Sequence, residues 1–262
     1  MEVLLLIILG VIQGVAEWIP VSSQGIISLI LLHFGISPNE AVNLAIWLHA
    51  GTLLAAVLYF RKDLKRLVNN LLPTLRGDIN DDSKFLMFIV IATVITCVVG
   101  FFVYQVVSWL AGTNLTVFMV LIGVCLILIG LIQKLAMKER TFRRLKIPDS
   151  ILIGLIQAFS IMPGLSRSGL TIATMLFLGY SAKDSVRISF ILSIPVIAMA
   201  EAYLLLTNKA YLLIPSAAIG VLVSAVVGYA TIGTLMNVAS KLKSWLFCIL
   251  IGCLSLIPMI IT

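Results

Sequence analysis

Two short stretches of the chain carry the side chains whose types and spacing could do chemistry. The first contains Gln13, Glu17, Ser22, Ser23 and Gly25. Gln13 and Glu17 stand four residues apart in an apolar run, which places them on one face of a helix. A carboxylate inside an apolar membrane segment is costly unless it faces a cavity, water or a cation. We therefore expect Glu17 to face an interior site, the alternative being a glutamate near water at a helix end.

The second stretch has the same design with an arginine at its centre. It contains Gly164, Ser166, Arg167, Ser168, Gly169 and Thr171. A guanidinium group binds phosphate oxygens in a planar, bidentate way and keeps its charge when buried. Placed among hydroxyls, glycines and a helix start, Arg167 predicts a phosphate-binding loop. The alternative is an arginine that extends to a membrane interface.

Each stretch has the pattern of one helix that stops, a turn, and a second helix that starts. Pro20 and Pro163 interrupt the apolar runs, and the serines that follow can cap the next helix through its free backbone N–H groups. For Ser23, ordinary capping and a direct chemical role both stay open. His49 stands in the middle of a separate apolar run, where it either transfers protons or bonds to a neighbouring helix.

The composition of the chain is that of a helical membrane protein. Of its 262 residues, 61% are hydrophobic and 11% are charged, whereas soluble domains carry about 25% charged residues. The net charge of +7 comes from basic residues between apolar runs, without the stacking aromatics of nucleic-acid binders. We expect membrane lipids and no nucleic acid as partners.

The apolar runs predict a single membrane domain over residues 1–262. Re-entrant helical hairpins, which enter the bilayer and return to the same face, are expected at 3–36 and 150–179 because their arms are too short to span. Full spans are expected at 41–60, 85–107, 115–133, 186–206, 211–236 and 244–261. This order divides the chain into one repeat over about 1–135, a basic cytoplasmic loop at 134–149, and a second repeat over about 150–262.

The second repeat is expected to be inverted relative to the first. At an offset of 144 residues, Gly10, Ile12, Gln13, Ser22 and Gly25 meet Gly154, Ile156, Gln157, Ser166 and Gly169. Three spans after the first hairpin leave the second hairpin on the opposite side of the membrane. This topology puts 15 of the 18 Lys and Arg residues on one side, which the positive-inside rule makes cytoplasmic. Both termini then face outward from a multi-pass protein of the cell membrane.

The two stretches resemble the signature segments of a known family. QGVAEWIPVSSQG and MPGLSRSGLT, together with LHAGTLLA around His49, are similar to segments of the undecaprenyl-diphosphate phosphatase (bacitracin-resistance) family, over essentially the whole chain. The resemblance implies a membrane enzyme that removes the terminal phosphate from a C55-type polyprenyl diphosphate. The monophosphate product then serves again as a lipid carrier for cell-envelope glycans such as peptidoglycan.

The resemblance also implies roles for individual residues. Glu17, Ser23, Arg167 and His49 become the catalytic candidates, with Glu17 and Gln13 holding a divalent cation, Mg²⁺ or Ca²⁺. The remaining residues of the two stretches become substrate-binding candidates: Gln13, Ser22, Gly25, Gly164, Ser166, Ser168, Gly169 and Thr171. One position departs from the family, because Ile26 stands where many members carry a histidine. The attacking group is therefore open between Ser23, water and His49.

A second class of function also fits the sequence. Inverted repeats with broken helices are typical of transporters that alternate between two membrane sides. The same site could then carry a polyprenyl phosphate headgroup across the bilayer as a flippase. The sequence leaves the prenol length, the source and the oligomeric state open.

Overall fold

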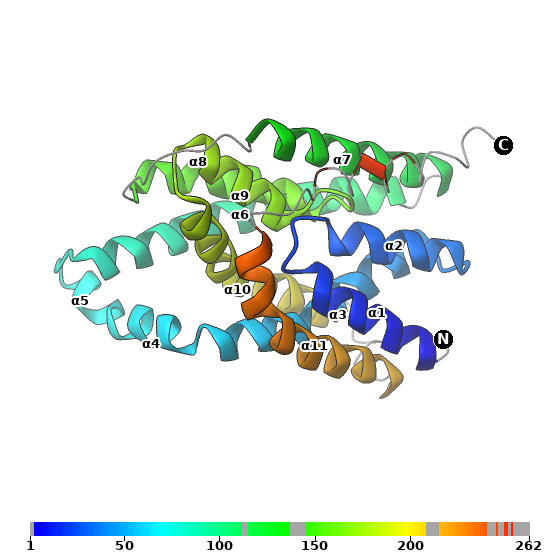
Figure 1. Cartoon of the computed structure of the whole chain (residues 1–262), viewed down its shortest axis with the longest axis horizontal. Helices are drawn as coiled ribbons and strands as arrows, with labels where there is room; N and C mark the ends of the chain where they lie inside the picture. The colour runs from blue at the N-terminus through cyan, green and yellow to red at the C-terminus, as the bar shows by residue number, and fades with distance from the viewer. Residues whose placement is uncertain are drawn as a thin grey trace.

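The computed structural model describes residues 3–111, 115–136, 145–207 and 215–239, together with residues 245, 249, 250 and 253. Over these residues the chain folds into helices (Figure 1). In order they are α1 (Val3–Ala16), α2 (Ser23–His33), α3 (Pro38–Tyr59), α4 (Arg61–Asn69), α5 (Leu71–Leu75), α6 (Asp81–Ala111), α7 (Leu115–Ala136), α8 (Ile147–Ala158), the short 3₁₀ helix η1 (Phe159–Ile161), α9 (Arg167–Phe177), α10 (Ala182–Thr207) and α11 (Pro215–Ala239).

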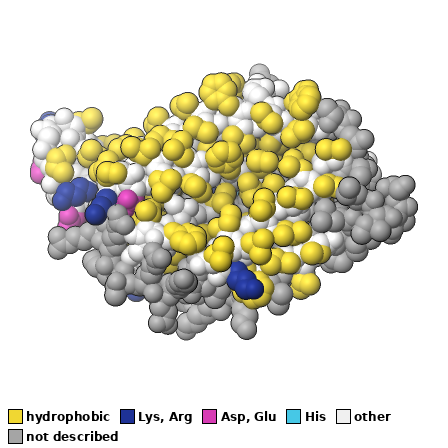
Figure 2. Space-filling view, turned by 90° about the horizontal axis from the view of Figure 1, so that it is seen from above, with side chains coloured by type: hydrophobic (Ala, Val, Ile, Leu, Met, Phe, Trp, Pro, Cys, Tyr) yellow, Lys and Arg dark blue, Asp and Glu magenta, His cyan; other side chains and the backbone are white. Residues whose placement is uncertain are grey.

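Within the described ranges, four helices are long and apolar enough to cross a membrane: α3, α6, α10 and α11. Figure 2 shows a face covered with hydrophobic side chains, while charged side chains gather at the end of the molecule where α4 and α5 lie. An apolar outer surface is what a lipid environment requires. These features confirm the prediction of an all-α membrane protein. The span expected at 244–261 falls almost wholly outside the described residues.

Between the spans expected at 41–60 and 85–107, the density of charged residues predicts a loop at 61–84, and the structure differs from this prediction. This segment contains α4 and α5, and α4 is amphipathic: Leu64 and Leu67 pack against the protein core. On the other side of α4, the Arg66 guanidinium donates to Asp82 of α6 at 2.6 Å. The many charged residues of this segment made it resemble a loop, but its few apolar residues are spaced so that they lie on one face of a helix.

Two helical hairpins, α1–α2 and α8–α9, each pack their first arm onto a long helix from the other half of the chain. Helix α1 lies against α11, and α8 lies against α6. Both contacts depend on glycine: a Cβ at Gly10 would lie 2.6 Å from the Gly220 carbonyl oxygen, and one at Gly154 would lie 2.7 Å from that of Ala92. The two halves thus exchange equivalent contacts. Their inverted, re-entrant placement in a bilayer stays a prediction.

The turns of the two hairpins touch each other backbone to backbone. A Cβ at Gly25 would lie only 2.7 Å from the backbone nitrogen of Gly164. Gly164 itself has a φ of +100°, which favours glycine, and a Cβ there would lie 2.5 Å from the Ile122 carbonyl oxygen. Glycine at both turns therefore permits the contact that brings the two polar stretches together.

Gly51→Ala should lower the stability of the folded protein. A Cβ at Gly51 would lie 2.8 Å from the backbone nitrogen of Ala225, so α3 and α11 must separate. We expect a loss of about 2 kcal/mol, typical of overpacking. The matched control is Gly233→Ala, whose Cβ would meet the Tyr59 ring at 3.4 Å. Thermal unfolding in detergent should separate the two variants, and equal midpoints would contradict the close α3–α11 contact.

Candidate active site

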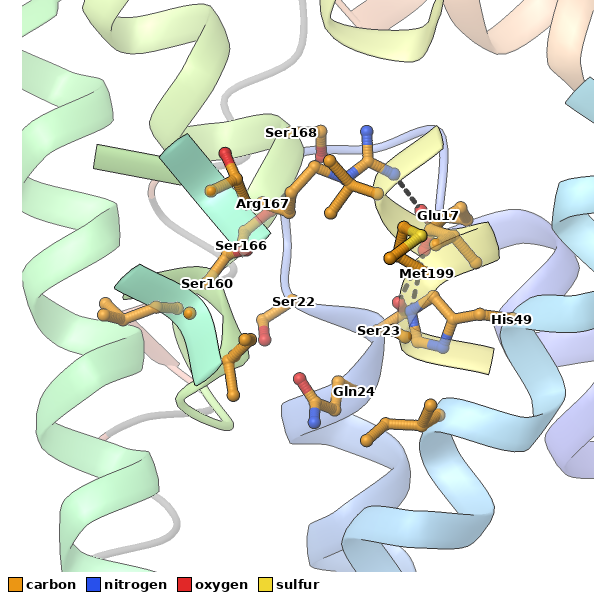
Figure 3. A pocket seen from close by; sticks show the side chains of 18 of the residues that line it. Glu17, Ser22, Ser23, Gln24, His49, Ser160, Ser166, Arg167, Ser168 and Met199 are labelled. Atoms are coloured by element: carbon orange, nitrogen blue, oxygen red, sulfur yellow. Dashed lines mark hydrogen bonds and ion pairs between the residues drawn. The ribbon is translucent and has the colours of Figure 1, made fainter. Parts of the chain in front are cut away.

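The Glu17 carboxylate is the point at which the predicted site residues converge (Figure 3). Glu17 follows α1 in the first hairpin turn and is only 6% exposed. Its Oε2 accepts hydrogen bonds from Gln13 Nε2 at 3.1 Å and Ser23 Oγ at 3.0 Å, and lies 3.2 Å from His49 Nε2. Its Oε1 is paired with the Arg167 guanidinium. One carboxylate therefore joins residues from α1, α2, α3 and α9.

The same capping device positions the polar residue at the start of α2 and of α9. Ser22 Oγ accepts a hydrogen bond from the Gly25 N–H at 3.3 Å, and Ser166 Oγ accepts one from the Gly169 N–H at 3.0 Å. Each helix then begins with a functional candidate, Ser23 in α2 and Arg167 in α9. Ser22 also adopts the left-handed region, with a φ of 41°, which bends the chain sharply after Pro20.

Trp18 fixes the first turn to the helices around it. Its indole Nε1 donates to the Gly228 carbonyl of α11 at 3.0 Å, and its ring meets Phe190 of α10 edge to face at 5.2 Å. The side chain is almost fully buried. This anchor restrains the backbone directly after Glu17, so the carboxylate is held rather than free to swing into solvent.

The Arg167 guanidinium is oriented by α10 as well as by Glu17. Its Nη1 donates to the Ser189 carbonyl oxygen at 3.1 Å. Thr171 braces this contact, because its hydroxyl donates to the Arg167 carbonyl at 2.9 Å and lies 2.6 Å from Ser189 Oγ. Ser168 Oγ donates to the Ile19 carbonyl at 3.5 Å, a long contact that links the two hairpin turns again.

His49 is held at both ring nitrogens. Nδ1 lies 2.7 Å from the Ala45 carbonyl oxygen one turn earlier in α3, and a carbonyl only accepts, so this nitrogen carries a proton. Nε2 faces the Glu17 carboxylate. Glu201 of α10 is close enough to interact electrostatically with His49. Its side chain is only 6% exposed.

A cavity of about 290 Å³ adjoins these residues. Of the predicted site residues, it is lined by Glu17, Ser22, Ser23, His49, Ser166, Arg167 and Ser168. Gln24 and Ser160 also line it and lie near the serines in Figure 3. Gln13 and Thr171 are fully buried behind this lining and support Glu17 and Arg167. Gly25, Gly164 and Gly169 shape the two turns. These three glycines, like Gln13 and Thr171, therefore have supporting positions.

Two supporting residues and one wall of the cavity were missed by the sequence analysis. Thr52 of α3 accepts a hydrogen bond from Gln13 Nε2 at 3.3 Å, and Ser189 of α10 orients Arg167. Single hydroxyls in apolar helices carry no signal that separates such roles from bonds within the helix. The apolar wall formed by α6 and α10 could not be recognised from the sequence either, since residues that face lipid and residues that face an apolar cavity are of the same types.

Fold and site together define an all-α membrane protein in which two hairpins from different halves of the chain join a glutamate and an arginine at an interior cavity. The model of one protein family, described as bacitracin resistance protein BacA, matches residues 6–257. The chain belongs to this family and is an integral membrane protein.

Two curated relatives match nearly the full length of the chain, and a third matches about three quarters of it. A protein of Methanococcoides burtonii named undecaprenyl-diphosphatase is 36% identical over 261 residues, covering 97% of each chain. A protein of Haloarcula marismortui with the same name is 37% identical, covering 97% of this chain and 96% of its own. A bacterial relative from Geobacter metallireducens, also named undecaprenyl-diphosphatase, is 35% identical over 74% of this chain and 72% of its own.

The Glu17–Arg167 pair should show strong energetic coupling. Arg167→Met leaves the buried carboxylate without its guanidinium partner, and we expect a loss of about 3 kcal/mol of stability. Adding Glu17→Gln should recover most of that loss, because the double variant buries no unpaired charge. Thermal unfolding of the wild type, both single variants and the double variant completes the cycle. Strictly additive losses would contradict a direct contact between the two hairpins.

Proposed function

We propose that this protein hydrolyses the terminal phosphate of a polyprenyl diphosphate, of the undecaprenyl type, and so regenerates the polyprenyl monophosphate. One observation carries the proposal: Glu17 and Arg167 meet at the contact of two hairpin turns, beside a cavity within an apolar helical protein. The Arg167 guanidinium, a group that can bind phosphate, and the Glu17 carboxylate would then both be within reach of a lipid headgroup. The names of the relatives support the same reaction.

Arg167 and the starts of α2 and α9 would hold the diphosphate. A guanidinium has five N–H donors, so its bonds to Glu17 and Ser189 leave capacity for phosphate oxygens. The α2 and α9 N-termini add backbone N–H groups and the positive ends of two helix dipoles. These fixed donors would stabilise the negative charge that builds on the bridging and terminal oxygens as the anhydride bond breaks.

Ser23 or a water molecule would attack the terminal phosphorus. The Ser23 hydroxyl already donates to Glu17 Oε2 at 3.0 Å, the geometry of a nucleophile beside its base. Glu17 would take the proton as the new P–O bond forms and the bond to the bridging oxygen breaks, releasing the prenyl monophosphate. With Ser23 as nucleophile, water would then cleave the phosphoserine and release inorganic phosphate. His49, engaged at both nitrogens, fits an orienting or proton-transferring role better than attack.

A divalent cation, Mg²⁺ or Ca²⁺, would be held by Glu17 and Gln13 together with the substrate. Gln13 Oε1 is a buried acceptor that meets no donor in the described structure, which suits an oxygen-preferring cation. Among the described residues there is no group of three or more His, Cys, Asp or Glu side chains suited to a metal, so the substrate would have to supply further oxygen ligands. When bound, the cation would neutralise charge on the diphosphate.

We further infer a multi-pass protein of the cell membrane with both termini outward. The argument is the distribution of basic residues, 15 of 18 on the side that includes α4 and α5. The first hairpin would then open toward the outer face. The regenerated monophosphate would serve again as a lipid carrier for envelope glycans such as peptidoglycan.

Glu17→Ala and Arg167→Ala should each reduce phosphate release from farnesyl diphosphate by at least about a hundredfold, because each removes a group that acts on the reacting phosphate. The control is Arg187→Ala, which breaks the Arg187–Asp63 ion pair between α10 and α4, away from the cavity. That variant should keep most of its activity. Full activity in either site variant, with the folded state verified by size-exclusion chromatography, would remove the proposed site.

A chelator should abolish phosphate release by the purified protein, and added Mg²⁺ or Ca²⁺ should restore it. The reason is that the diphosphate and Glu17 together carry more negative charge than the Arg167 guanidinium can neutralise, so a divalent cation would supply the remaining positive charge. The assay compares the wild type with Gln13→Ala, which should need a higher cation concentration for half-maximal rate. Undiminished activity after exhaustive chelation would exclude the cation from the reaction.

A polyprenyl-phosphate transporter is the second candidate, favoured by the contact between hairpin turns from the two halves of the chain. Purified protein that binds polyprenyl phosphate but releases no phosphate from the diphosphate under any divalent cation would favour this alternative. The variant Ile26→His tests the family's missing histidine in the same assay. A faster rate in this variant would show that the histidine's role is partly vacant in this chain.

A further inference from the structure

The cavity beside Glu17 and Arg167 has an apolar wall that the proposed chemistry does not use. This wall comes from one face of α6 and one face of α10. It includes Gly100, Phe101 and Tyr104 from α6, and Met199, Ala200 and Tyr203 from α10. On each helix these residues recur every three or four positions, so they form one continuous stripe. The polar residues and the two stripes line the same space.

Aromatic rings join the two stripes. The Tyr203 ring lies 5.3 Å from the Tyr104 ring and 6.1 Å from the Phe101 ring, both in edge-to-face geometry. All three rings lie in the C-terminal halves of their helices, since α6 ends at Ala111 and α10 ends at Thr207. The wall therefore contains polarisable, flat surfaces that suit unsaturated hydrocarbon.

The wall also reaches the outer surface of the protein. Phe101 and Met199 both line the cavity, yet they are 47% and 55% exposed. These fractions include any area that faces the cavity, but a side chain enclosed by a cavity of this size would not be about half exposed, so both residues lie at the rim of an opening. Met199 lines the same cavity as Glu17 and His49 (Figure 3), so this opening leads into the space that the charged groups line. The surface around it is apolar, with Phe102 and Val98 also exposed on α6.

We propose that the opening at Phe101 and Met199, beside the ring contacts that join α6 and α10, is the passage through which the prenyl chain of the substrate leaves the cavity and enters the lipid. Its first isoprene units lie against Phe101, Tyr104, Met199 and Tyr203. This inference rests on the proposed function, because it assumes a diphosphate held at Arg167. A cavity of about 290 Å³ is at the small end of ligand pockets. It suits a headgroup and the start of a chain, so a longer tail must leave sideways.

The occupant is a prenyl chain rather than any lipid chain, because the apolar wall and the polar residues line one cavity and must be filled by the same molecule. An acyl chain of an ordinary phospholipid would bring a bulky, substituted phosphate to Arg167. A prenyl diphosphate joins its chain directly to the phosphate, so both ends of the same cavity are filled by one molecule. Aromatic rings and the Met199 thioether add contacts to the double bonds of the first units.

A chain-length comparison tests the passage. Phosphate release is measured from isopentenyl and farnesyl diphosphate, and the ratio of the two kcat/KM values is compared between variants. Tyr203→Ala should lower the farnesyl preference about tenfold, mainly through a higher KM for farnesyl diphosphate, since it removes buried aromatic contact with the chain. Tyr203→Phe should keep the wild-type ratio. The control Trp109→Ala removes a 69% exposed ring of α6 that lies outside the cavity lining, and should also keep it.

A binding measurement separates failure of the passage from failure of the proposed function. A farnesyl diphosphate analogue with a photoreactive group in its first isoprene unit should crosslink to peptides of α6 and α10, and excess farnesyl diphosphate should compete. If the wild type crosslinks there but releases no phosphate, the hydrolase proposal fails and the passage stands. Crosslinks elsewhere, competition only by phospholipid, or an unchanged farnesyl preference in Tyr203→Ala would overturn the passage.

Discussion

The structure depends on a buried ion pair between two residues that lie 150 positions apart in the chain, Glu17 and Arg167. Neither charge is tolerated alone in an apolar interior, since isolated buried charges cost several kcal/mol. Each therefore requires the other hairpin to be in place. The pair thus links the two halves of the chain, and it places a carboxylate and a guanidinium at one cavity. The same constraint that holds the halves together also forms the site that we propose for the phosphate.

Close backbone approach makes this pair possible. Gly25 and Gly164 let the two turns touch, while Gly10 and Gly154 let the first arms lie against α11 and α6. Small residues at helix contacts are the usual means of tight association in lipid, where no hydrophobic force drives helices together. Since these contacts are exchanged between the halves, each hairpin is held by the other half's long helix. The site is a property of the whole chain and not of either half.

The residues of the charged cluster could be predicted from the sequence, because a glutamate, an arginine and a histidine in apolar segments are costly to bury unless they face a polar site. The repeated turn pattern predicted that Glu17 and Arg167 share one site, whereas the sequence could not place His49 there. The contacts of Ser189 with Arg167 and of Thr52 with Gln13 could not be predicted, since a single hydroxyl in an apolar helix has no distinctive neighbours in sequence. The same holds for Phe101 and Tyr203, whose cavity-facing and lipid-facing sides are equally apolar. Helix α4 was missed because its charges outnumber its two packed leucines.

The most direct test of the shared Glu17–Arg167 site is an experimental structure of the protein with a non-hydrolysable polyprenyl diphosphate analogue, in which a methylene group replaces the bridging oxygen. We predict the terminal phosphonate in hydrogen-bond contact with the Arg167 guanidinium and next to Ser23 and Glu17. An analogue bound at another place on the protein, with the Glu17–Arg167 pair closed and the cavity empty of phosphonate, would contradict this site.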